Sequence, residues 1–68
     1  MKQHERIIDY IDRFGSISPY EAFADLGITK LATRISEMRR AGVEILGKLE
    51  QSTNRYGETV RFMRYRRP

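Results

Sequence analysis

Residues 18–42 read SPYEAFADLGITKLATRISEMRRAG, and this stretch carries start and stop signals for two short helices. Ser18, Pro19 and Glu21 form a capping box with proline at the first helical position. In such a box the serine hydroxyl accepts from a free backbone N–H and the glutamate reaches back to the cap. These residues predict a helix that begins at Pro19. Gly27 supplies the left-handed conformation that ends such a helix.

After the turn, another helix is predicted over residues 30–41, with Thr29 as its N-cap and Gly42 as the residue that ends it. It carries four basic side chains, Lys30, Arg34, Arg39 and Arg40. Two short helices joined by a tight turn are typical of a helix-turn-helix, a unit that can place its second helix in the major groove of DNA. The stretch therefore indicates a nucleic-acid ligand.

Three helices are predicted in all, and each has one apolar stripe at helical spacing. The first covers residues 3–14, the second residues 19–26 and the third residues 30–41. Their core side chains are expected to be Ile7, Ile8, Ile11 and Phe14 in the first, Ala22, Phe23 and Leu26 in the second, and Leu31, Ile35 and Met38 in the third.

Beyond Gly42 the apolar residues alternate, which is typical of strands. Residues 43–50 predict one strand and residues 59–65 a second, and the turn-forming run between them predicts a hairpin tip near residues 52–56. Ile17 is expected to add a very short third strand at the sheet edge. Because an isolated hairpin is only marginally stable in water, its apolar side should pack on the helices. The side chains expected to do so are Phe62, Met63 and Tyr65.

Three helices followed by a two-stranded hairpin form the layout of a winged helix. In three runs, ISPYEA at 17–22, LGITKLATRI at 26–35 and RRAGVEI at 39–45, the sequence resembles the winged helix-turn-helix superfamily. More narrowly, it is similar to small helix-turn-helix proteins of bacteriophages and other mobile elements. The resemblance implies one mainly α domain over residues 1–68 with a C-terminal wing. It also implies binding to double-stranded DNA in the regulation of transcription or recombination.

The segment between Gly27 and Gly42 is shorter than in the commonest winged regulators, so the third helix is expected to be short or to begin immediately after the turn. One copy of so small a domain covers few base pairs. Useful specificity is therefore expected to need a homodimer or adjacent copies on DNA.

The formal net charge of +4 is unevenly distributed along the chain. Residues 1–28 hold 3 Lys or Arg against 5 Asp or Glu, whereas residues 29–68 hold 10 against 4. The basic part thus begins where the predicted third helix begins. An asymmetry of this kind favours a polyanionic partner.

Side chains on the third helix are candidates for reading base edges, because Lys and Arg donate to guanine, Thr contacts the thymine methyl and Glu accepts from cytosine. These candidates are Lys30, Thr33, Arg34, Glu37 and Arg40. Arg34 has a second interpretation, in which it braces the helix against an acidic residue of the first helix.

Candidates for contacts to the DNA backbone, or for contacts through the wing, are Thr29, Lys48, Arg55, Tyr56, Arg66 and Arg67. Arg55 at the hairpin tip can enter a minor groove or meet a phosphate, and it can equally be an exposed turn residue. Arg61 and Arg64 on the last strand have a different expected role, because arginines along an edge strand prevent pairing with another sheet.

The sequence offers no parts for catalysis. It has no cysteine, a single histidine at His4 and no GxxxxGK[ST] phosphate loop, so we expect no enzyme, no metal, no cofactor and no small-molecule ligand. No apolar run approaches the ~20 residues of a membrane span, and no signal-peptide core is present, so a cytoplasmic location is expected. Two alternatives to DNA binding stay open, a protein-binding adaptor and an RNA-binding module.

Overall fold

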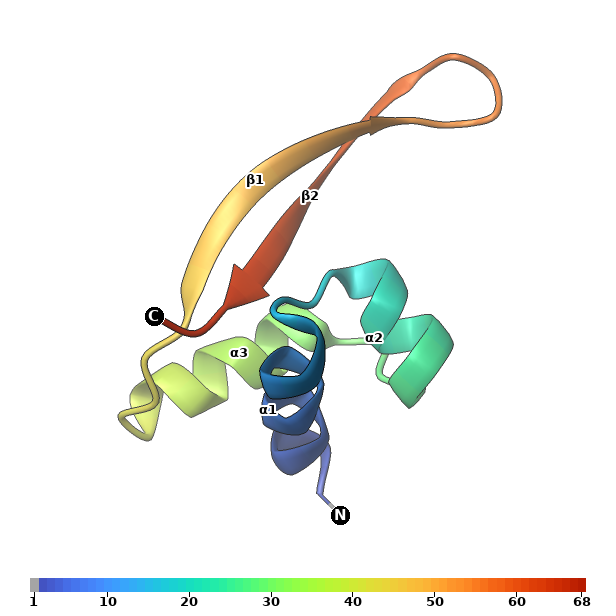
Figure 1. The fold of residues 1–68 in the computed structure, drawn as a ribbon. Coiled ribbons are helices and arrows are strands. Elements are labelled where there is room, and N and C mark those ends of the chain that lie inside the picture. Colours follow the sequence, from blue (N-terminus) through green and yellow to red (C-terminus); the bar gives the residue numbers. More distant parts are fainter. Residues whose placement is uncertain (1) are drawn as a thin grey trace.

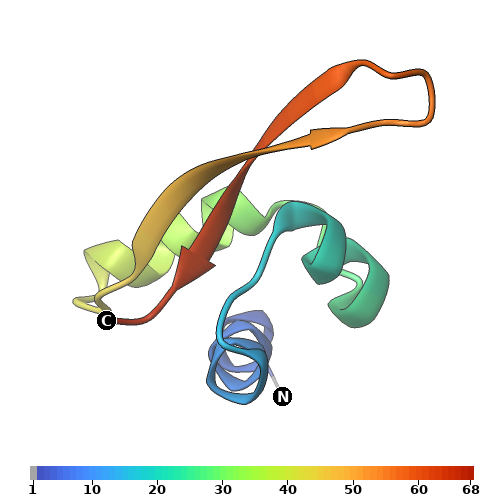
Figure 2. The same ribbon diagram turned by 45° about the horizontal axis from the view of Figure 1, so that its top comes forward.

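The computed structural model describes residues 2–68 as three helices followed by a two-stranded antiparallel sheet (Figures 1 and 2). The helices are α1 (Gln3–Phe14), α2 (Pro19–Leu26) and α3 (Leu31–Arg40), and the strands are β1 (Leu46–Thr53) and β2 (Thr59–Arg66). The hairpin starts beside the C-terminal end of α3 and extends past the helices to a distant tip (Figure 1). The winged layout expected from the sequence is confirmed.

The ends of α1 and α2 lie where the sequence predicts them. At the start of α2 the backbone N–H of Glu21 donates to Ser18 Oγ at 3.3 Å, and the N–H of Ser18 donates to Glu21 Oε1 at 2.9 Å, which completes the capping box. At its end Gly27 has a φ of 69°, and its N–H donates to the carbonyl of Phe23 at 3.1 Å.

The third helix is shorter by one residue at each end than predicted, and Thr29 is not its N-cap. The N-cap is Lys30, whose carbonyl accepts from the N–H of Arg34 at 3.2 Å. No side chain caps this end of the helix. The expectation of a short third helix is confirmed, since α3 has 10 residues.

The turn after α3 explains why the first strand begins later than predicted. Gly42 has a φ of 95°, and its N–H donates to the carbonyl of Arg39 at 3.1 Å. The N–H of Val43 donates to the carbonyl of Met38 at 3.0 Å. These two bonds form a Schellman motif. Because the motif engages Val43, the strand pairing begins only at Leu46.

The hairpin tip lies at residues 54–58 rather than 52–56. Asn54 Oδ1 accepts from the N–H of Tyr56 at 2.9 Å and from that of Glu58 at 3.0 Å, and Gly57 has a φ of 76°. The asparagine side chain therefore organises the turn. At the other end of the hairpin, Ile17 pairs with Tyr65 through two backbone hydrogen bonds of 2.8 Å, which confirms the expected short third strand as a single bridge.

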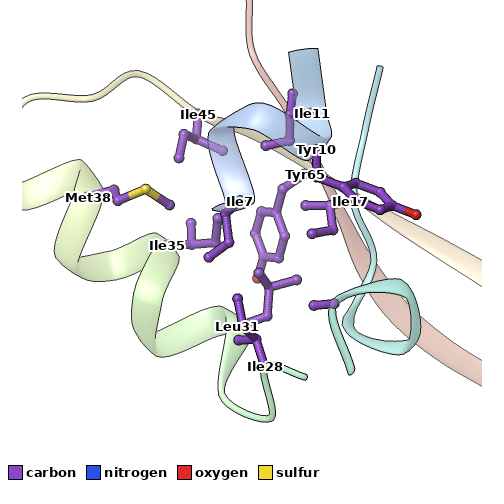
Figure 3. Packing of buried hydrophobic residues seen from close by; sticks show 11 residues of the cluster. Ile7, Tyr10, Ile11, Ile17, Ile28, Leu31, Ile35, Met38, Ile45 and Tyr65 are labelled. Atoms are coloured by element: carbon purple, nitrogen blue, oxygen red, sulfur yellow. The ribbon is translucent and has the colours of Figure 1, made fainter. Parts of the chain in front are cut away.

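One apolar cluster joins the three helices and β2 (Figure 3). The ring of Tyr65 projects from β2 into the helices and lies among buried isoleucines (Figure 3). The cluster contains Ile7, Tyr10, Ile11, Ile17, Ala22, Ile28, Leu31, Ile35, Met38, Ile45 and Tyr65. Met63 packs against it, so the helices support the base of the hairpin. Phe62, expected to pack there too, is half-buried but not part of the cluster, because neighbouring side chains on a strand point to opposite faces.

The two phenylalanines of the helices that were predicted for the core also lie outside it. Phe23 is 60% exposed, since it lies about 100° around α2 from the buried Ala22. Phe14, the last residue of α1, is 68% exposed and its ring lies 4.6 Å from that of Tyr10. Tyr10 is buried instead, and its hydroxyl donates to Asp25 at 2.6 Å. This hydrogen bond and burial raise the pKa of Tyr10 to about 12.

Candidate nucleic-acid interface

The side of α3 opposite its buried stripe faces solvent. Leu31, Ile35 and Met38 fill the core and fix the rotation of the helix about its axis. The exposed side chains on this side are Lys30, Thr33, Ser36 and Arg40. Thr29, just before the N-cap, is also exposed. Three of the five predicted base-reading residues, Lys30, Thr33 and Arg40, therefore share a free surface.

The other two predicted base-reading residues, Arg34 and Glu37, bind each other on the flank of α3 that faces α1. Glu37 Oε1 accepts from Arg34 Nη1 at 2.8 Å and from His4 Nε2 at 2.9 Å. The hydrogen bond from His4, with the nearby charge of Arg34, lowers the pKa of the Glu37 carboxyl. The alternative role suggested for Arg34 is thus corrected, because it braces an acid of its own helix rather than one of α1.

The flank of α3 that faces the hairpin carries Arg39, which the sequence identified only as one more basic residue. Its Nε and Nη2 donate to the carbonyl of Ile45 at 3.2 and 2.8 Å. Its guanidinium carbon lies 5.8 Å from the centre of the Tyr65 ring. No local pattern predicts these contacts, because they depend on how the chain turns at Gly42.

The basic residues of the hairpin divide into free and bound ones. Lys48, Arg55, Tyr56 and Arg61 are exposed, and Arg55 and Tyr56 lie in the turn at the tip. Arg64 is not a free edge residue, since only 29% of its side chain is exposed. Its Nε donates to Glu50 at 2.8 Å, and its Nη1 donates to Glu21 at 2.9 Å and to Ser16 at 3.1 Å.

The two arginines near the C-terminal end, both candidates for contacts to the DNA backbone, are placed differently from each other. Arg66 is the last residue of β2, opposite Leu46. Arg67 Nη1 donates to both carboxylate oxygens of Asp12 on α1 at 3.1 Å. Both arginines are exposed. An exposed pair of this kind contributes little to stability and can exchange partners.

The described part of the chain, residues 2–68, shows no group of three His, Asp or Glu side chains that could hold a metal ion. Within the same residues, none of the helices has the length and apolar character needed to span a membrane.

A family model described as a winged helix-turn-helix domain matches residues 2–66 of the chain. Because the match covers almost the whole chain, the protein belongs to the winged helix-turn-helix family, a class whose fold suggests DNA binding and is typically not enzymatic. Searches of curated proteins and of solved structures gave no match.

Proposed function

We propose that residues 1–68 act as one winged helix-turn-helix domain that binds double-stranded DNA, with α3 in the major groove and the hairpin on the backbone. The observation that carries this proposal is the outer side of α3. Within residues 2–68, no side-chain hydrogen bond or ion pair engages Lys30, Thr33, Ser36 or Arg40, although all four are exposed on one short, rigidly packed helix. Side chains of these types read base edges.

Lys30, Thr33 and Arg40 are our first candidates for base contacts, and Ser36 joins them from the structure. Arg34 and Glu37 are secondary candidates, because either would have to give up a hydrogen bond of the His4–Glu37–Arg34 network to reach a base. An extra cost of this kind weakens a contact relative to one made by a free side chain.

Contacts to the DNA backbone are proposed at both ends of the interface. The first turn of α3 has no side-chain cap, so its free N–H groups beside Thr29 and Lys30 can hold a phosphate. At the hairpin tip, Arg55 and Tyr56 can enter a minor groove or meet the backbone. Lys48 is a further wing candidate, and Arg66 and Arg67 add affinity that is independent of sequence.

The biological setting is proposed from resemblance, as regulation of transcription or recombination in a phage or other mobile element, in the cytoplasm. Specific recognition would use a homodimer or adjacent copies, because one copy presents only one short reading helix.

The test is a titration of binding to random-sequence duplex DNA against salt, with duplex RNA and single-stranded DNA as competitors. A complex with about six phosphate contacts should lose roughly 10³-fold in affinity between about 50 and 200 mM salt. No measurable duplex affinity near 50 mM salt would favour a protein-binding adaptor. Preference for unpaired strands would favour the alternative of an RNA-binding module, in which aromatic and arginine side chains stack on bases.

A further inference from the structure

One side chain of α3, Arg39, contacts the chain on both sides of the hairpin base, just before β1 and near the end of β2. Its guanidinium donates two hydrogen bonds to the carbonyl of Ile45, the residue just before β1. The same group lies 5.8 Å from the ring centre of Tyr65, near the end of β2. Arg39 thus connects the helix proposed to read bases with the strands that carry the wing.

The guanidinium of Arg39 lies beside Gly47 of β1. Gly47 lies opposite Tyr65 in the strand pairing. A Cβ at Gly47 would lie at ordinary contact distance, 3.5 Å, from Arg39 Nη2, but only 2.8 Å from Met63 Cε, so a side chain there would displace the tip of Met63. The planar guanidinium can donate two bonds to one oxygen while it covers an aromatic face, and lysine, with a single ammonium, cannot do both.

In a long hairpin, a small change of angle at the base moves the tip by a large distance. Strand β1 has 8 residues, so the tip lies about 26 Å from the base. A tilt of ~10° at the base would move the tip by ~5 Å, more than the reach of a hydrogen bond. Arg64 hydrogen-bonds the hairpin to α2, and Arg39 hydrogen-bonds α3 to the base of the hairpin.

We propose that Arg39 is a positioning residue that fixes the angle between the hairpin and α3, and thereby sets where Arg55 meets DNA when α3 is in the groove. Its relevance to DNA rests on the proposed function, whereas its effect on the angle does not. The proposal is therefore tested in two arms, one without DNA and one with it.

The first arm measures the distance between α3 and the wing in the free protein. The chain has no cysteine, so spin labels on Ser36→Cys and Ser52→Cys report one distance by pulsed electron resonance. We expect one narrow distribution, which Arg39→Lys and Arg39→Met broaden or shift. Arg40→Lys changes a neighbour with no side-chain hydrogen bond to the hairpin within residues 2–68, so it serves as the matched control and should leave the distribution unchanged. The Arg39→Lys variant decides the question even if Arg39→Met does not fold. Unchanged distributions in the Arg39 variants would overturn the proposal.

The second arm is a double-mutant cycle on duplex DNA. If Arg39 positions the wing, Arg39→Lys should weaken binding by about tenfold in the intact protein, and by much less when Arg55→Ala has already removed the tip contact. If Arg39 only supplies charge, Arg39→Lys should bind like the parent protein, and that result would contradict the proposal. Failure of the parent protein itself to bind duplex would refute the proposed function, while the distance measurement still decides the role of Arg39.

Discussion

Arg64 Nη1 donates to Glu21 Oε1 at 2.9 Å, and the same oxygen accepts the backbone N–H of Ser18 at 2.9 Å. One carboxylate therefore closes the capping box of α2 and also binds an arginine of β2. The start of the helix-turn-helix and the docking of the wing share this group, so the two units are expected to lose stability together.

Replacement of Glu21 tests this coupling. Glu21→Ala removes half of the capping box and a partner of the half-buried Arg64, so we expect a loss of about 2 kcal/mol in the free energy of unfolding. Urea unfolding followed by circular dichroism measures it. Glu44→Ala, which removes an exposed carboxylate outside the helices and strands, is the control. Equal stabilities of the two variants would show that the shared carboxylate has no such role.

Tyr10 should link stability to alkaline pH. Its pKa is raised from 10.0 to about 12 because its hydroxyl donates to Asp25 and is buried, so the folded state favours the neutral phenol. The resulting stabilisation is complete below pH 10 and should be lost as the pH rises from about 10 to about 12. Tyr10→Phe should lower the free energy of unfolding by about 1 kcal/mol at neutral pH and should reduce the loss of stability between about pH 10 and pH 12. Melting temperatures of the two proteins between pH 8 and pH 12 provide the comparison, and parallel curves would contradict the assignment.

Glu37, a secondary candidate for base reading, should act mainly as a structural acid. Its pKa is lowered by the hydrogen bond from His4 and by Arg34, so its contribution to stability is present above its unfolded value of 4.5 and lost as pH falls through its lower folded value. We expect Glu37→Gln to weaken this acid dependence. On DNA the variant should bind all duplexes more tightly without a change in preferred sequence, because one negative charge is removed. A changed preference at one base pair would instead show that Glu37 contacts that base.

Arg40 and Arg67 should affect DNA binding in different ways. Arg40→Ala should weaken the free energy of binding to the preferred site by about 1–3 kcal/mol and relax the sequence preference at one base pair. Arg67→Ala should weaken all duplexes alike and lower the salt slope by up to about 1. Binding isotherms on two unrelated sequences at several salt concentrations separate the effects. Identical behaviour of the two variants would contradict the assignment of base reading to α3.

Signals that act between neighbouring residues were sufficient to predict most of the fold. Pro19, the capping box and Gly27 define α2 through bonds within a few residues, and the alternation after Gly42 identifies the hairpin. The assignment of Thr29 as a cap was wrong, although its residue type suits a cap. Helical hydrogen bonding begins one residue later, from the carbonyl of Lys30.

The features that the sequence did not reveal depend on contacts between distant segments. The sequence suggested base reading for Glu37, edge protection for Arg64 and only a basic charge for Arg39, but each has a partner that is distant or lies across the turn after α3. Phe23 is exposed because it lies about 100° around α2 from Ala22, which is the residue of that helix that the core buries. Such outcomes are set by tertiary packing rather than by local preference.

The most direct test of DNA recognition by α3 is selection of preferred sites from a random duplex pool, run with the parent protein and with Arg40→Ala. We expect the parent to enrich a short motif, present twice at a fixed spacing if two copies bind together, and Arg40→Ala to lose the preference at one position of that motif. Enrichment of no motif by the parent, or of the same motif by both proteins, would contradict base reading by this helix.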